Sequence, residues 1–179
     1  RDNDTFKNLR TIPVTSTQMI FAKIIVLFLF GLIFCLSTAA VTIVCGSLIA
    51  EVGGLGYKLW LSVEMGIFIT AGTLPLVVLV VFFSKTYIFS VLLCIFYSVL
   101  SLTAESSFGV LPKFLCWLMP IPLTNLWCAG DMVRHGVKGS LGELQYLIPS
   151  TTQTVLILSA MAVLSILLID RLYKKRGGN

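Results

Sequence analysis

Few side chains in this sequence could do chemistry, and none stands in a catalytic or phosphate-binding motif. The 179 residues contain no G-x-x-x-x-G-K-[ST] phosphate loop, no dinucleotide glycine fingerprint, and neither H-E-x-x-H nor G-x-S-x-G. His135 is the single histidine, and the residues around it offer no second metal ligand at a suitable spacing. We therefore expect a loop histidine in water, no metal site, no cofactor bound directly and no enzymatic activity. Any energy source has to lie in another protein.

Two acidic residues lie close to apolar runs, and each is expected near the outer end of a span. An ionisable side chain inside a bilayer is usually functional, so Glu64 and Glu105 could line a substrate path. At a span end, either carboxylate could instead reach water at little cost. Pro75 leaves a similar choice, because it could be a hinge or only a kink that fits neighbouring helices.

Composition predicts that these residues are positioned by helices in a membrane. The chain is 57% hydrophobic and 12% charged, with a mean hydropathy of +0.97, whereas about a quarter of a soluble domain is charged. We expect an all-α integral membrane protein with a single domain. Its predicted parts are a polar segment (1–18), four spans (19–50, 59–83, 86–104 and 150–170), a glycine-rich turn (51–58), an outer loop (105–149) and a tail (171–179).

The outer loop contains an apolar stretch that cannot cross as one helix. Pro120 and Pro122 interrupt it near its middle, and each half is too short to span. Non-helical backbone at membrane depth survives only under cover of protein or water, so we expect a re-entrant or interfacial helical hairpin. With Trp117 beside it, the hairpin could gate an exit or merely anchor the loop. Three aromatic residues suit the headgroup level: Trp117, Trp127 and Tyr146.

Charge predicts which side of the membrane holds the ends. Four spans place both ends on one side, together with nine of the 13 basic residues: Arg1, Lys7, Arg10, Lys23, Lys85, Arg171, Lys174, Lys175 and Arg176. The positive-inside rule makes that side cytoplasmic. The net charge of +5 is explained in this way, and no nucleic-acid role follows. The five cysteines form no CxxC pair, although Cys116 and Cys128 share the outer loop and could pair in an oxidising compartment.

The first 23 residues are the one long polar segment joined directly to a membrane-length run. Phe6, Leu9 and Ile12 give its first helix an apolar stripe, and Pro13 ends that helix. A capping box formed by Thr15 and Gln18 then begins the helix of the first span. An amphipathic helix at the interface, feeding into a span, suits contact with a soluble partner.

This opening segment resembles the coupling-helix region of ABC-2 type exporter permeases, and within that family it is most similar to the lantibiotic-immunity and bacitracin-export group. The residues that carry the resemblance are Asp4, Thr5, Lys7, Asn8, Leu9, Pro13, Val14, Thr15, Ala22 and Lys23. The remainder of the chain agrees with the family in its layout of spans.

The resemblance implies a permease subunit in a bacterial plasma membrane, paired with a second permease subunit as a homodimer or heterodimer. A separate cytoplasmic ATPase would bind ATP and magnesium, and a further pair of spans would precede Arg1. The cargo would be an antimicrobial peptide taken from the membrane lipid. Another ABC-2 exporter of drugs, lipids or polysaccharide, or a scaffold or sensor that transports nothing, stays open. The residues expected to contact the ATPase are Asp4, Thr5, Phe6, Lys7, Asn8, Leu9, Ile12 and Pro13.

Overall fold

The computed structural model describes residues 16–49, 53–83, 86–108, 110, 112–137 and 142–177. Within these ranges the chain is helical and contains no strand, which confirms the all-α prediction. The elements are α2 (Ser16–Ser47), α3 (Leu55–Phe82), α4 (Tyr87–Ser106), α5 (Lys113–Leu118), α6 (Pro120–Arg134), the 3-10 helix η1 (Gly142–Leu147) and α7 (Thr151–Gly177).

Four of the described helices are long and apolar enough to cross a membrane. Their apolar stretches are Thr17–Ser47, Leu55–Phe82, Ile88–Ser106 and Thr151–Tyr173, so the predicted number of spans is confirmed. In α2 only 6% of the most apolar window is buried within the chain. Leucine, isoleucine and phenylalanine side chains cover such outward faces, as hydrocarbon surroundings require.

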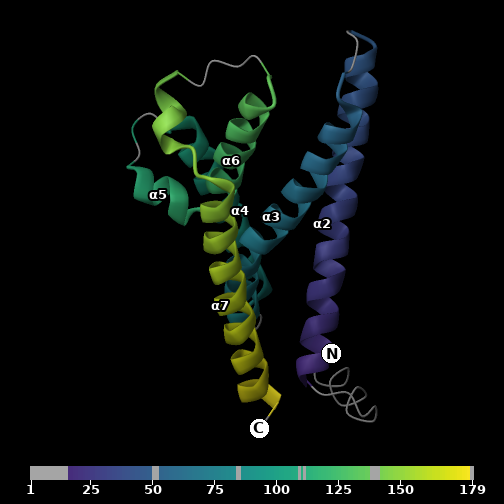
Figure 1. Ribbon diagram of the computed structural model, residues 1–179. Helices are drawn as coiled ribbons and strands as arrows, with labels where there is room; N and C mark the ends of the chain where they lie inside the picture. Colours follow the sequence, from purple (N-terminus) through teal and green to yellow (C-terminus); the bar gives the residue numbers. More distant parts are fainter. Residues whose placement is uncertain are drawn as a thin grey trace.

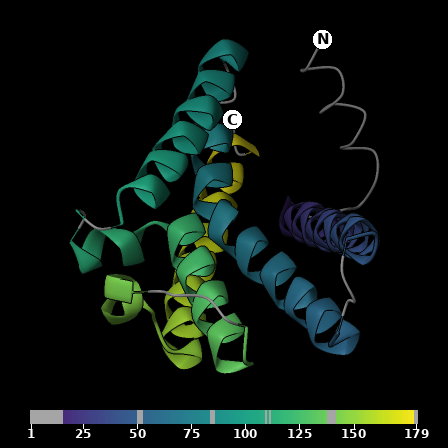
Figure 2. The same ribbon diagram turned by 90° about the horizontal axis from the view of Figure 1, so that it is seen from above.

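Helix α3 occupies the centre of the arrangement (Figure 1). It contacts α2, α4, α6 and α7. Seen from above, it crosses diagonally, with α2 on one side and α4 and α7 on the other (Figure 2). The beginning of α2 and the end of α7 lie at the same end of the molecule, which we call the terminal end (Figure 1).

Small residues allow α2 and α3 to cross closely. A Cβ atom on Gly31 would overlap the Thr70 Oγ1 atom, and one on Gly66 would lie 3.3 Å from the Cα atom of Leu32. Close backbone approach through small side chains is the usual way in which helices associate in lipid. Thr70 is itself fixed, because its hydroxyl donates to the Gly66 carbonyl oxygen at 2.6 Å. We call this contact the α2–α3 crossing.

Some helix boundaries differ from those that the sequence predicted. Helix α3 begins at Leu55 rather than near residue 59, because Gly54 takes a left-handed backbone conformation (φ 66°) that starts the helix there. The predicted turn over 51–58 is therefore shorter. Helix α3 continues through Pro75, and α7 continues to Gly177, so most of the predicted tail is helical.

A capping box starts α7 at the point where the sequence predicted the last span to begin. The Gln153 backbone N–H donates to the Ser150 Oγ atom at 3.2 Å, and the Ser150 N–H donates to the Gln153 Oε1 atom at 3.0 Å. The equivalent box predicted before α2 includes Thr15, which lies outside the described residues.

The interrupted stretch of the outer loop forms two helices that meet at Met119. Met119 has an extended backbone (φ −90°, ψ 116°), and α6 begins at Pro120 with Pro122 in its first turn. Prolines are tolerated there because the first turn has no intrahelical partners for its N–H groups. The two prolines thus begin a helix rather than break one. At 15 residues, or about 22 Å, α6 is too short to cross a membrane.

Candidate functional site

The predicted ATPase-contact segment lies outside the described residues. It comprises Asp4, Thr5, Phe6, Lys7, Asn8, Leu9, Ile12 and Pro13. The structure describes the chain from Ser16, where α2 starts, and α2 is 32 residues long. A helix of that length measures about 48 Å, so it connects the terminal end to the opposite end of the molecule.

Pro120 lies deep inside the protein, where the α5–α6 bend meets two long helices. A Cβ atom on Gly72 of α3 would lie 2.5 Å from the Pro120 Cβ atom and 3.6 Å from the Leu158 Cδ2 atom of α7. Pro122 is fully buried as well. The bend is therefore clamped between α3 and α7 through a glycine, and its two prolines belong to the packed interior.

Trp127 anchors the same region from the middle of α6. It is 1% exposed, its ring meets Phe68 edge to face at 4.7 Å, and its Nε1–H donates to the Thr151 hydroxyl at 3.1 Å. Leu123, Ala71 and Leu158 form the neighbouring core cluster. Trp127, which was expected to suit the headgroup level, is thus enclosed by protein rather than exposed to lipid. We call this packed region of α3, α6 and α7 the central core.

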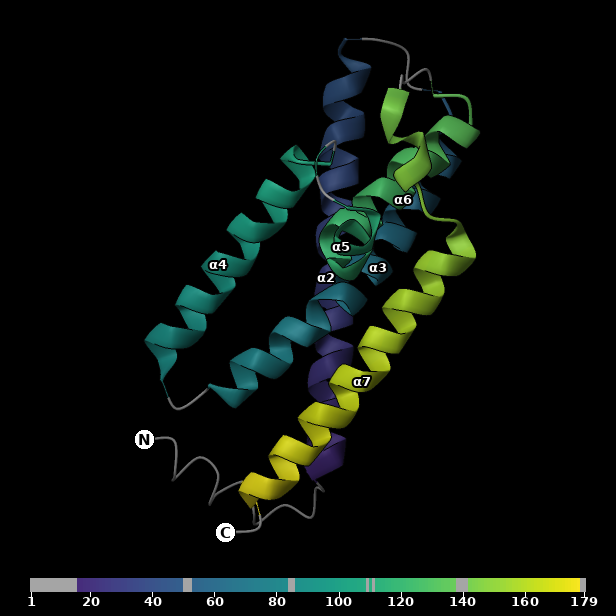
Figure 3. The same cartoon turned by 90° about the vertical axis from the view of Figure 1, so that its left-hand side faces the viewer.

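Helix α5 is held to the loop behind it and presents an apolar face outward. The Trp117 Nε1–H donates to the Leu147 carbonyl oxygen at 2.9 Å, and the Lys113 ammonium lies 4.6 Å from the centre of the Trp117 ring. Phe114 and Leu118 are exposed. Figure 3 views α5 nearly end-on while α4 and α7 run across the view, so α5 lies across the long helices. Such an orientation suits an interfacial helix.

The two cysteines of this region do not pair. Cys116 and Cys128 are both free thiols, and Cys116 is buried against Leu126 and Leu147. Burial, with the nearby Asp131 carboxylate as a second cause, raises the pKa of the Cys128 thiol.

The two acidic residues singled out from the sequence lie in different surroundings. Glu105 accepts a hydrogen bond from the Asn125 amide, which joins the end of α4 to α6. Glu64 accepts one from the Trp60 indole on its own helix at 2.9 Å. Because α3 begins at Leu55, Glu64 lies about 14 Å along the helix. It lies on the surface of α3 between the second and third helical turns from the helix start.

A polar cluster that sequence reasoning missed joins α3 to the end of α6. The Tyr57 hydroxyl donates to the Asp131 carboxylate at 2.7 Å, and the His135 Nδ1 atom lies 3.3 Å from the same carboxylate. The rings of Tyr57 and His135 stack with their centres 4.2 Å apart. His135 is exposed as predicted, but it is the C-terminal cap of α6 rather than an isolated loop residue. The four-residue spacing of Asp131 and His135 was the available signal.

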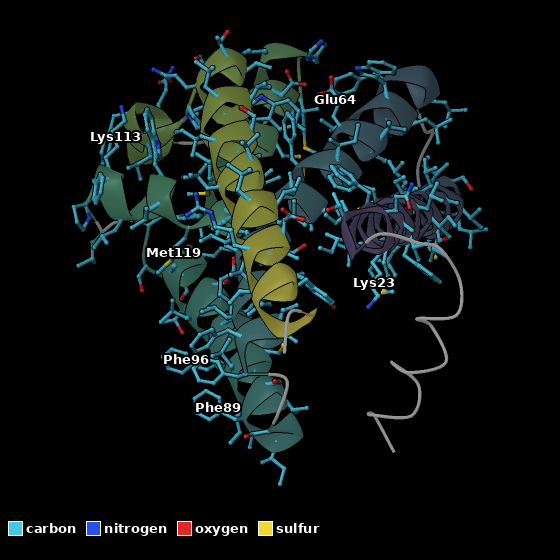
Figure 4. All side chains as sticks on the ribbon, turned by 90° about the horizontal axis from the view of Figure 1, so that it is seen from below. Lys23, Glu64, Phe89, Phe96, Lys113 and Met119 are labelled. Atoms are coloured by element: carbon cyan, nitrogen blue, oxygen red, sulfur yellow. The ribbon has the colours of Figure 1, made fainter. Side chains whose placement is uncertain are left out.

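A second missed cluster joins α2 to α7 at the terminal end. The Thr17 hydroxyl donates to the Asp170 carboxylate at 3.0 Å, and the Lys23 ammonium donates to the Tyr173 hydroxyl at 3.3 Å. Figure 4 looks onto this end and shows Lys23 on α2, with Phe89 and Phe96 of α4 projecting away from the other helices. Nothing in the sequence linked these residues, which stand about 150 positions apart.

Comparison with known proteins gave one match. The model of a family described as "ABC-2 family transporter protein" matches residues 1–101, which include α2, α3 and most of α4. No curated protein and no solved structure matches the chain.

Proposed function

The chain belongs to the ABC-2 transporter family, and from that membership we propose that it is the membrane permease subunit of an exporter that expels cationic antimicrobial peptides. The observation that carries the proposal is the extent of the family match. It starts in the polar opening segment and extends past the first two apolar helices, to residue 101. The match thus includes both a segment suited to contact a soluble partner and the helices that the partner would move.

The partner in this proposal is a separate cytoplasmic ATPase that binds ATP and magnesium. Closure of a pair of such ATPases would press on the segment from Asp4 to Pro13. Since α2 starts only three residues after Pro13, a displacement of that segment acts on the first turn of α2. A ligand-driven conformational change needs an element that can occupy two positions. Of the four long helices, α2 has the smallest buried share of its apolar window, so it is the best candidate for that element.

The α2–α3 crossing gives that motion a pivot in this proposal. Gly31 meets Thr70 about 23 Å from the start of α2, near the middle of the helix. A close backbone contact near the middle of a helix gives that helix a point about which to tilt. Tilting of α2 would change the spacing between its ends and the helices beside it.

Support for a peptide cargo comes from the opening segment, which resembles the permeases of lantibiotic immunity and bacitracin export. An amphiphilic, cationic peptide is attracted both to apolar surface and to carboxylates. The outward apolar faces of the four spans supply the apolar surface, and Glu64 and Glu105 supply the carboxylates. The export direction, the cytoplasmic position of both ends and a second permease subunit belong to the same proposal.

Association with the ATPase tests the coupling part of the proposal. Leu9→Asp should abolish co-purification of the ATPase, because it places a charge in the apolar stripe, while the protein stays in the membrane. Val110→Asp is the matched control, since Val110 is 90% exposed and lies between α4 and α5, far along the chain from the opening segment. Normal recovery of the ATPase with Leu9→Asp would overturn the proposed coupling surface.

Peptide sensitivity tests the cargo. Cells that express the full-length protein with its ATPase should survive higher concentrations of nisin-like peptides than cells without it. A variant ATPase that cannot hydrolyse ATP should remove that protection. Equal sensitivity in all three strains, together with ATP-dependent export of a drug, lipid or polysaccharide, would assign the chain to a different exporter. Association without any ATP-dependent transport would favour a scaffold or sensor.

A further inference from the structure

We infer that the contacts Thr17–Asp170 and Lys23–Tyr173 form a latch, here called the α2–α7 latch, which closes the seam between the first and last described spans at the terminal end and has to open during each transport cycle. This inference rests on the proposed function, because it assigns a step of the same cycle to named residues.

The position of the two contacts makes them a closure at one end. Thr17 and Lys23 lie in the first two turns of α2, whereas Asp170 and Tyr173 lie in the last two turns of α7. In Figure 1 the two helices are nearest at the terminal end and separate toward the other end. A hydrogen bond between α2 and α7 at the end where they are nearest restricts the angle between the two helix axes.

Two apolar side chains next to the polar contacts are buried. Ile20 stands between Thr17 and Lys23 on α2, and Ile169 immediately precedes Asp170 on α7; both are 3% exposed. Most of the remaining surface of α2 faces outward. Ile20 is therefore a buried side chain of α2 at the terminal end, and the inference requires that opening the seam exposes it.

The chemistry of the latch suits a contact that is made and broken repeatedly. A threonine hydroxyl on a carboxylate and an ammonium on a phenol can exchange their partners for water, because both pairs are partly or fully exposed. The Lys23 ammonium also lies 5.3 Å from the centre of the Tyr173 ring. At exposed sites such cation–aromatic contacts are weak. A core contact buried between helices could not be released without unpacking the protein.

The latch also lies where a driving force would arrive. Thr17 is the second residue of α2, so a push on the polar segment before Ser16 reaches the Thr17–Asp170 bond before any other described contact between α2 and α7. Tilting of α2 about the α2–α3 crossing would then separate the start of α2 from the end of α7. The strength of the latch contacts would determine how much force on α2 is needed to separate it from α7.

Cross-linking in the full-length protein with its ATPase tests the inference. Thr17→Cys and Asp170→Cys are introduced together after the five native cysteines have been replaced by serine. Without nucleotide, copper phenanthroline should link the pair efficiently. With the ATPase trapped by ATP and vanadate, the yield should fall several-fold. The control pair is Gly31→Cys and Thr70→Cys at the α2–α3 crossing, where a Cβ atom on Gly31 lies 3.4 Å from the Thr70 Cβ atom; it should link equally in both states.

The outcomes separate the latch from the proposed function. An equal yield of the 17–170 link with and without trapping would overturn the latch, as would undiminished peptide export by the linked protein. Failure of the unlinked cysteine variant and of the parent protein to export any peptide would instead contradict the proposed cargo. The dependence of the link on trapped nucleotide decides the latch in that case too.

A second measurement covers the possibility that the double-cysteine variant does not fold. Ile20→Cys in the otherwise cysteine-free protein should react slowly with maleimide, because Ile20 is buried in the closed seam. Adding Thr17→Val and Tyr173→Phe, which remove the polar partners without changing shape greatly, should raise that rate several-fold. Leu158→Cys, which is also buried on α7 but belongs to the central core, should keep its rate. An unchanged rate at position 20 would contradict the latch.

Discussion

The central core and the α2–α7 latch both hold α7 in place, but they do so with different means. In the central core, Trp127 and Pro120 are buried. A Cβ atom added to Gly72 would lie only 2.5 Å from the Pro120 Cβ atom, so there is no space for a side chain there. At the terminal end, two hydrogen bonds reach across a seam that water can enter. The first arrangement resists any relative movement of α3, α6 and α7. The second can be opened without disturbing the packing elsewhere.

This difference teaches which parts of the chain can move as units. Helices α3, α6 and α7 each contribute a buried side chain to one core cluster, so we expect them to move as one body. Helix α2 packs along α3, reaches the central core through Phe28 and meets α7 at the latch, while most of its surface faces outward. The division follows from packing density, because interdigitated cores have few alternative arrangements. Experiments that weaken each region separately can break or sharpen this comparison.

Trp127→Ala should have the largest effect. It removes a ring that is almost wholly enclosed, together with its hydrogen bond to Thr151. Loss of a buried aromatic side chain typically costs about 3–5 kcal/mol. We expect a fall of that size in the free energy of unfolding, measured by SDS titration in mixed micelles. Trp60→Ala is the control, because Trp60 is 63% exposed and should change stability little.

Gly31→Val at the α2–α3 crossing should come next. The added carbons would overlap the Thr70 hydroxyl, which is held by its bond to the Gly66 carbonyl oxygen. Overpacking of this kind costs about 1–3 kcal/mol. Combination with Thr70→Ala should restore part of the loss. Gly56→Val, at a position with nothing within 4 Å of an added Cβ atom, should leave packing undisturbed. Equal losses at positions 31 and 56 would show that the crossing is not a tight contact.

The sequence predicted the helices better than it predicted their contacts. Long uncharged runs fix the number of spans, and the Ser150–Gln153 capping box fixes the start of α7, because both signals are local. The exact start of α3 was missed, since it depends on the left-handed backbone of Gly54. The sequence prediction placed the helix break at Pro120 and Pro122. The break lies at Met119 instead, because proline is compatible with the first turn of a helix.

The clusters between helices could not be predicted, because they join residues far apart along the chain. Asp131 meets Tyr57 across 74 positions, and Asp170 meets Thr17 across 153. Hydrophobic pattern determines which residues lie in a span, but not which helices are neighbours. The same limit applies to Trp127, because its aromatic type alone does not indicate that its ring is buried between helices.

The rate at which Cys128 of α6 reacts with maleimide at a given pH should depend on the charge of Asp131. Burial and the Asp131 carboxylate raise the pKa of this thiol. The thiolate is the species that reacts, so a raised pKa lowers the labelling rate at a given pH, and the rate climbs only at more alkaline pH. Asp131→Asn removes the negative charge and keeps an acceptor for Tyr57. It should therefore increase maleimide labelling of Cys128 at pH 8, with the other four cysteines replaced by serine. An unchanged rate would show that burial alone protects the thiol.

Tyr173→Phe should have the smallest effect on stability. It removes the acceptor of the Lys23 ammonium at an exposed site and leaves the ring under the cation. Exposed contacts of this strength contribute about 0.2–1 kcal/mol at most. The unfolding transition should therefore hardly move, whereas the maleimide rate of Ile20→Cys in the same protein should rise. A large loss of stability would place Tyr173 among the residues that hold the fold, and the contrast between a fixed core and an openable seam would fail at that residue.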